Sequence, residues 1–149
     1  MGQTQQERAE AKEIKNLKNR VNYLISKAVK TVKVTLTAAQ LKTSNTVPVV
    51  IVPAPGVGKH IIPLYASGKT NWNSVAFDAQ DLYLLMSAYV FTDNNFLLGA
   101  TSDTRVSFGP IADFNFVENT AITLNTLADS VATGDSTIDI YVTYSIGNE

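Results

Sequence analysis

The sequence predicts a mainly β protein in which an N-terminal α-helix, a coiled-coil stalk, precedes a β-sandwich or jelly-roll head. Three observations lead to this prediction. The composition changes near residues 30–34, because all five prolines and seven of the eight glycines come after this point. About eight short segments rich in β-branched and aromatic residues then follow, with turn signals between them. Before the change, the apolar residues have helical spacing.

The first segment of the chain is predicted to be helical. Residues from Gln5 to about Lys30 are mostly Glu, Arg, Ala, Lys and Leu, which favour a helix. Thr4, followed three residues later by Glu7, predicts a capping box at its start. We therefore divide the chain into a helical oligomerisation or attachment segment, residues 1–31, and a β-sandwich head domain, residues 32–149.

One face of this helix carries apolar residues with the a and d spacing of a coiled coil. The residues of this seam are Ile14, Leu17, Val21, Leu24 and Ala28. After Leu24 the apolar stripe widens to include Ile25, Val29 and Val32, as expected where a stalk enters a head. A helix with about two heptads of seam is marginal alone, so it needs a partner.

The partner predicted for the seam is the same chain. β-branched residues at a with Leu at d favour a dimer, but a bulky attached head can override this preference. The spacing therefore predicts self-association and leaves a homodimer and a homotrimer open. The alternative to self-association is an amphipathic helix that packs on its own β body.

The charge is distributed unevenly, although the whole chain has a net charge of -1. Residues 1–33 hold eight Lys or Arg and three Glu, whereas residues 34–149 hold four Lys or Arg and ten Asp or Glu. The lysines spread around the helix, and Tyr23 is the only aromatic residue among them. We therefore expect a solvated helix face and no nucleic-acid binding.

Composition also argues against several other classes of protein. The chain has no cysteine, which excludes a disulfide framework and a thiolate metal site. No apolar run reaches the roughly 18 residues that cross a bilayer, so membrane insertion is not expected. The polar and charged first residues do not resemble a secretory signal.

The first half of the head is predicted to contain three strands. Val32, Val34 and Leu36 alternate with polar residues, which is typical of a half-buried strand. The segment PAPGVG, residues 53–58, separates two apolar strands, and we expect these strands to form a tight hairpin. Strands are predicted over residues 32–36, 49–52 and 60–65, with a helical turn over 37–41 and a polar break over 67–71.

The second half of the head is predicted to contain six more strands. The run LYLLMSAYVF, residues 82–91, is interpreted as one buried strand because Tyr, Val and Phe favour strands. Residues 137–146 alternate, with Ile138, Ile140, Val142 and Tyr144 expected on one face. Further strands are predicted over residues 96–98, 105–108, 114–117 and 121–124, with a turn over 92–95 and a loop over 130–136.

The segment PGVGKH, residues 55–60, superficially resembles a phosphate-binding loop. Such a loop needs a Gly five residues before its Gly-Lys pair and a Ser or Thr after it, but Pro53 and His60 occupy these positions. A strand follows, not a helix whose N-terminus could hold phosphate. Nucleotide binding is therefore not expected, and no cofactor is predicted.

No constellation of residues predicts an enzyme or a metal site. His60 is the only histidine, and nothing marks a catalytic partner for it. Asp78 and Asp81 could bind calcium or act as an acid–base pair, but they lack the dense spacing of a calcium loop and are expected to be solvated turn residues. Trp72 is the candidate ligand contact: it could stack on a sugar or anchor a partner, and otherwise it caps a core.

Residues 39–59, AQLKTSNTVPVVIVPAPGVGK, carry a family resemblance. A Leu, a short polar gap, Pro-Val, a β-branched run and Pro-Ala-Pro-Gly-x-Gly-Lys make this segment similar to a stretch of small virion proteins of tailed bacteriophages. Val47 stands where that pattern has Thr. The resemblance implies a β-sandwich head, often trimeric, that serves as a head fibre, a decoration protein or a tail-associated module. It implies no catalytic residues.

We therefore expect a non-enzymatic structural protein of a bacteriophage virion, made in the host cytoplasm and projecting from the capsid as a trimeric head fibre or decoration protein. Its expected partners are its own copies and other virion proteins such as the capsid. The alternative is a tail-associated host-attachment module whose head binds a receptor or a surface glycan through Trp72 and tyrosines. An enzyme such as a glycan depolymerase is not expected, because no carboxylate constellation marks one.

Overall fold

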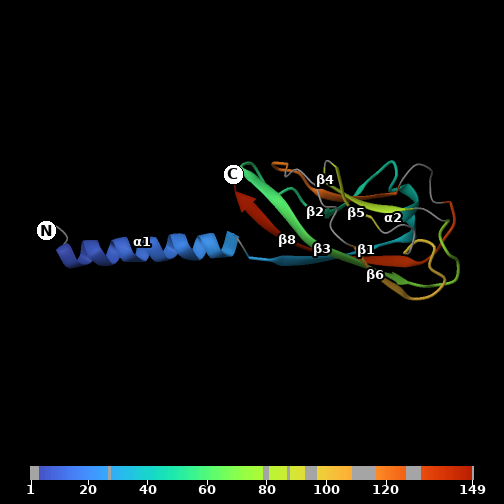
Figure 1. Ribbon diagram of the computed structural model, residues 1–149, viewed down its shortest axis with the longest axis horizontal. Coiled ribbons are helices and arrows are strands. Elements are labelled where there is room, and N and C mark those ends of the chain that lie inside the picture. The colour runs from blue at the N-terminus through green and yellow to red at the C-terminus, as the bar shows by residue number, and fades with distance from the viewer. Residues whose placement is uncertain are drawn as a thin grey trace.

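The protein consists of one long helix that projects from a mainly β body (Figure 1). The computed structural model describes residues 4–26, 28–78, 81–86, 88–92, 97–108, 117–126 and 132–148. Helix α1 (Gln5–Ser26) extends away from the body, so that the N-terminus lies far from every strand, while the C-terminal end of the last strand lies close to the end of the helix (Figure 1).

The predicted capping box starts α1. The backbone N–H of Thr4 donates to Glu7 Oε2 at 2.7 Å, and the backbone N–H of Glu7 donates to Thr4 Oγ1 at 3.2 Å. The helix ends at Ser26, earlier than the predicted end near Lys30, and a strand begins at Lys30. Val29 and Thr31 lie in this region, and β-branched residues favour extended backbone over helix.

The described strands of the body form two antiparallel sheets of four strands each. The first, here called the β8 sheet, has the order β1-β8-β3-β6, and the second, the β7 sheet, has the order β2-β7-β4-β5. The β8 sheet contains β1 (Lys30–Leu36), β8 (Thr137–Asn148), β3 (Lys59–Asn71) and β6 (Thr104–Phe108). The β7 sheet contains β2 (Val49–Val52), β7 (Ile122–Thr126), β4 (Leu82–Met86) and β5 (Ala88–Thr92).

Both sheets contribute to one hydrophobic core. In β8, the predicted alternation is confirmed, because Ile138, Ile140 and Val142 are fully buried whereas Tyr141 and Thr143 are only partly so. The central strand of the other sheet, β7, alternates in the same way. The residues with the largest fully buried side chains are Phe91, Leu36, Leu41, Ile51, Ile61, Leu82, Leu84, Met86, Leu97, Leu98, Ile122 and Leu124.

The predicted helical turn after β1 is a short helix, α2 (Ala38–Thr43). Thr37 caps it: the backbone N–H of Gln40 donates to Thr37 Oγ1, and the backbone N–H of Thr37 donates to the Gln40 side chain. The helix buries Leu41 in the core. Ser44, which follows the helix, is buried and its hydroxyl lies 3.1 Å from Thr126 Oγ1, so α2 is tied to the end of β7.

The predicted hairpin across residues 53–58 is wrong. Strand β2 pairs with β7, and β3 pairs with β8 and β6, so this segment crosses from one sheet to the other. Strands β2 and β3 face the same core from opposite sheets. Packed sheets lie about 10 Å apart, and the connection is long enough to span that distance. Its glycines have positive φ angles, 100° at Gly56 and 71° at Gly58. Their N–H groups donate to Asn119 Oδ1 and to the Glu118 carboxylate, respectively.

The predicted break at residues 67–71 is also wrong, because these residues belong to β3, which is 13 residues long. Gly68 does not form a turn. A Cβ atom at this position would lie 2.3 Å from Leu97 Cδ1, so the glycine makes room for a core side chain. Residues 67–71 are therefore a closely packed part of a strand, where a loop was predicted.

The run at 82–91 is two strands and not one. Strands β4 and β5 pair antiparallel, with Met86 opposite Ala88. Of the segment predicted as a strand at 96–98, Leu97 and Leu98 lie in a turn and are fully buried. The predicted turn at 93–95, most of the strand at 114–117 and the loop residues 130 and 131 lie outside the described residues. The predicted strands at 105–108 and 121–124 correspond to β6 and β7.

Candidate functional site

The apolar seam of α1 faces solvent. Ile14, Leu17, Val21 and Leu24 are 54%, 52%, 51% and 66% exposed, respectively. Helix α1 extends away from the strands (Figure 1), and all four side chains are more than half exposed. The alternative in which the helix packs on its own β body is therefore wrong. Half-exposed apolar side chains along one face of a projecting helix are typical of an interaction surface.

The seam forms a shallow apolar groove on the helix. Ile14, Leu17 and Val21 line it, with Lys18 and Asn22 along one side. The fifth predicted seam residue, Ala28, lies beyond the end of the helix at Ser26 and cannot continue the heptad. Of the residues predicted to widen the stripe, Val29 is exposed in the linker, Val32 lies in β1, and the side chain of Ile25 lies outside the described set.

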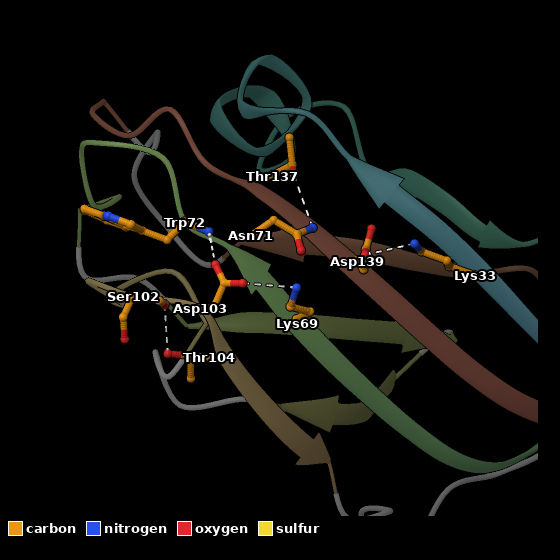
Figure 2. A network of polar contacts seen from close by, with 9 residues as sticks. All are labelled: Lys33, Lys69, Asn71, Trp72, Ser102, Asp103, Thr104, Thr137 and Asp139. Atoms are coloured by element: carbon orange, nitrogen blue, oxygen red, sulfur yellow. Dashed lines mark hydrogen bonds and ion pairs between the residues drawn. The ribbon is translucent and has the colours of Figure 1, made fainter.

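The end of the body away from α1, here called the remote end, carries loop residues 72–78, 97–103 and 132–136 (Figure 1). Trp72 lies there and is half-buried. Its backbone N–H donates to Asp103 Oδ1 at 2.9 Å. The other carboxylate oxygen, Asp103 Oδ2, forms an ion pair with Lys69 Nζ at 3.2 Å. Figure 2 shows the Trp72 ring pointing away from this polar network. The Trp72 N–H, followed by Lys69, holds the pKa of the Asp103 carboxyl below its ordinary value.

Asp135 ties two remote-end loops together. Its Oδ1 accepts the backbone N–H of Ser74 at 3.0 Å and of Val75 at 2.9 Å, while Oδ2 accepts the Asn73 side chain at 2.9 Å and the Ser74 hydroxyl. The Ser74 hydroxyl, then the Val75 and Ser74 N–H groups, lower the pKa of Asp135 to about 2. The carboxylate is therefore used to fix loop geometry.

Lowering the pH to about 2 is expected to release this loop contact. The folded-state pKa of Asp135 lies below its ordinary value of 3.8, so its stabilising contribution is present above that value and is lost as the pH falls towards about 2. An NMR titration of the carboxyl carbon should give a midpoint near 2, and the Ser74 and Val75 amide shifts should follow it. The Ile140 amide serves as the control that should not follow. A midpoint at 3.8 would contradict the prediction.

The other carboxylates and the histidine considered from the sequence have structural contacts. Asp78 accepts the Ala132 N–H at 3.1 Å and the Thr133 hydroxyl, and the Thr133 hydroxyl bond is the larger cause of its lowered pKa. The Tyr83 hydroxyl donates to Asp81 at 3.0 Å. His60 is half-buried against Gly147, where a Cβ atom would lie 2.3 Å from its Nε2.

Within the described residues, no three His, Asp or Glu side chains come together as a metal site would require. None of the helices in the described parts of the chain is long and apolar enough to cross a membrane.

A polar network on the outer face of the β8 sheet was not singled out from the sequence. Lys33 Nζ lies 2.9 Å from Asp139 Oδ2 (Figure 2). The Thr35 hydroxyl donates to Asp139 Oδ1 at 2.6 Å. Burial raises the pKa of Asp139, but the bonds from Thr35 and Lys33 outweigh burial and leave it below its ordinary value. The Lys33 ammonium also lies 5.6 Å from the centre of the Tyr141 ring. Period-2 alternation placed these residues on the polar face, but only the register between strands joins them.

No protein-family model matches the sequence, and no match was found among curated proteins. Among solved structures, the chain is similar to a chain of the structure entitled "Cyanophage Pam1 capsid asymmetric unit". The two share 17% sequence identity with a TM-score of 0.46, over 79% of this chain and 83% of the other.

Proposed function

We propose that this chain is a non-enzymatic structural protein of a bacteriophage virion, a head fibre or capsid decoration protein. In this proposal the α1 helices of three copies form a coiled-coil stalk, and the β bodies are jelly-roll heads that project from the particle. The observation that carries the proposal is the seam of Ile14, Leu17, Val21 and Leu24, which is exposed on a helix that extends away from its own body.

The pairing of the strands supports a jelly-roll head. The first strand pairs with the eighth, the second with the seventh, the third with the sixth and the fourth with the fifth. Such nested pairing is expected when one long antiparallel ribbon is rolled into two packed sheets. Jelly rolls of eight strands in two sheets are common in viral capsid and lectin domains.

The sequence resemblance of residues 39–59 to small virion proteins of tailed bacteriophages also supports the proposal. This segment contains α2, β2 and the connection over residues 53–58 that crosses between the sheets. Its Pro-Ala-Pro-Gly-x-Gly-Lys motif is explained by that crossing, because two glycines with positive φ and two prolines without donors suit an unpaired connection.

The proposed role is a mechanical and multivalent one. The stalk joins several heads, so that weak contacts made by each head with the capsid or with a surface add up to a durable attachment. The helix, about 33 Å long for its 22 residues, also separates the heads from whatever its N-terminal end contacts.

Immunogold electron microscopy tests the location of the protein. An antibody against the β body would be applied to phage particles from the source lysate. Label distributed over the capsids supports a head fibre or decoration protein. Label confined to the tail tip replaces this proposal with the tail-associated one, and particles without label overturn both.

The second candidate is a tail-associated module that binds a receptor or a glycan of the host. The observation that favours it is the position of Trp72, which is half-buried at the remote end, where the head would meet another surface. If Trp72 contacts a glycan, a solution of that glycan should quench its fluorescence.

A further inference from the structure

The outer face of the β8 sheet has a pocket of about 200 Å³. It lies over strands β3, β6 and β8, away from the seam of α1. One lining residue, Lys69, pairs with Asp103, the carboxylate that accepts the Trp72 N–H. Its lining includes Tyr65, Ser67, Lys69, Arg105, Ser107 and Tyr141. All six alternate with core residues along their strands, so their side chains belong to the solvent side of the sheet.

The register between strands explains why this face is hollow. Ser67 stands opposite Tyr141 on one side and opposite Ser107 on the other, so two small side chains are adjacent in one row. The next row places Lys69 opposite Arg105. The two serines therefore form a floor with large side chains around it, and the Tyr65 hydroxyl closes one edge at 2.6 Å from Ser107 Oγ.

Two cations line the pocket, Lys69 and Arg105, and of these two only Lys69 forms an ion pair with another described residue. Lys33 pairs with Asp139, and Lys69 pairs with Asp103. Arg105 is exposed and forms no ion pair within the described residues, but it lies close enough to Asp103 to help lower the pKa of that carboxyl. Lys69 and Arg105 therefore carry two positive charges beside the single negative charge of Asp103. A guanidinium binds a carboxylate through two parallel hydrogen bonds, and Lys69 lies opposite Arg105 across the strands to add a second positive charge.

We propose that this pocket binds a saccharide that carries a carboxylate, such as a uronic acid unit. Arg105 and Lys69 hold the carboxylate, the hydroxyls of Ser67 and Ser107 bond to sugar hydroxyls, and the ring of Tyr141 packs against the sugar. Tyrosine suits such a contact because it has an apolar ring and a polar hydroxyl and loses little side-chain conformational entropy on binding. The site is separate from the proposed structural role, since a head fibre can carry such a site or lack it.

Carboxylate-bearing sugars fit these residues better than free phosphate does. Phosphate would engage Arg105 and Lys69 but would leave the aromatic ring and the floor of serines without a partner. The ring and hydroxyl groups of a sugar can contact both the aromatic ring and the serine hydroxyls. The size of the pocket is close to that of one or two sugar units, below the usual range of about 300–1,000 Å³ for sites of drug-sized ligands.

Isothermal titration calorimetry of the full chain tests the proposal with three probes. These are a tetramer of galacturonic acid, the same tetramer with its carboxylates methyl-esterified, and inorganic phosphate. The acid tetramer should bind at least about tenfold more tightly than the ester, since hydrogen bonds to a charged group are the strong ones. Equal affinity for acid and ester, phosphate binding as tight as that of the acid, or no binding of the acid would each overturn the proposal.

Variants locate the binding on this face. Arg105→Gln should weaken binding of the acid tetramer by about tenfold or more, and Arg105→Lys should weaken it less. Lys59→Gln is the matched control, because it removes a positive charge from an exposed position of β3 outside the pocket, and it should change the affinity less than about twofold. Unfolding temperatures equal to that of the unaltered chain would show that each variant is folded. Unchanged affinity in folded Arg105→Gln protein would place the site elsewhere and overturn the assignment.

Discussion

The chain carrying both Leu17→Glu and Val21→Glu is expected to be a monomer in solution, whereas the unaltered chain is expected to be a trimer. Leu17 and Val21 are consecutive d and a positions at the centre of the seam, and each is about half exposed in the single chain. Because the helix extends away from its own body, burying these side chains requires a partner outside the chain, and in the proposed function this partner is the same helix of other copies.

The free energies of burying the seam and of desolvating the new carboxylates decide whether the double variant associates. Burying the exposed half of one such side chain contributes about 1 kcal/mol, so the four helical seam residues give a modest stabilisation for each chain. A carboxylate placed between helices instead carries a desolvation penalty of several kcal/mol. Two such carboxylates in each chain outweigh everything that the remaining seam residues, Ile14 and Leu24, can supply.

Size-exclusion chromatography with multi-angle light scattering measures the effect directly. The matched control is the chain with Asn16→Glu and Asn19→Glu, which adds the same charge to the c and f positions of the helix and should keep the oligomer. The mass of the unaltered chain also distinguishes a trimer from the alternative dimer. An oligomer of the same mass in the seam variant and the unaltered chain would refute the stalk.

Leu124→Ala is expected to lower the free energy of unfolding by about 3 kcal/mol. Leu124 is fully buried in β7, between strands β2 and β4, where it stands opposite Val49 and Leu84. Removing three side-chain carbons there loses the transfer free energy of the buried atoms and leaves a cavity in the core. Neighbouring strands fix the backbone on both sides, so the site cannot easily collapse.

Chemical denaturation followed by circular dichroism measures this change. All variants should be compared at one protein concentration, because association shifts apparent stability. Thr123→Ala is the control on the same strand, since Thr123 points to the other face and is only half-buried. Its effect should stay below about 1 kcal/mol. If the two substitutions destabilised the protein equally, the register of β7 would be wrong.

Sequence reasoning succeeded where the signal is local. The alternation of Val32, Val34 and Leu36 predicted β1, the pairing of Thr4 with Glu7 predicted the start of α1, and the 3–4 spacing predicted an apolar helix face that the structure shows exposed. Each of these features depends on residues within one or two turns, or within one strand.

Predictions from the sequence failed where the structure depends on contacts between segments that are distant in the sequence. Residues 53–58 contain every sign of a hairpin turn, but the strands on either side belong to different sheets. Gly68 suggested a loop, but a glycine is needed there because the Leu97 side chain, from another segment, packs against it. The pocket was invisible for the same reason: Ser67, Ser107 and Tyr141 become neighbours only through strand register.

The nested pairing of the strands has a consequence for folding kinetics. Lys30 in the first strand stands opposite Tyr144 in the last, so the outermost pair of the ribbon joins segments from nearly opposite ends of the body. Proteins dominated by such distant contacts fold slowly, because the chain must close long loops before those contacts form. The β8 sheet cannot be completed until β8 has left the ribosome, whereas α1 precedes the body and needs only local hydrogen bonds to form. Helices of neighbouring nascent chains are therefore available to associate before any head has closed, and association in that order would raise the local concentration of unfinished strands with unpaired edges.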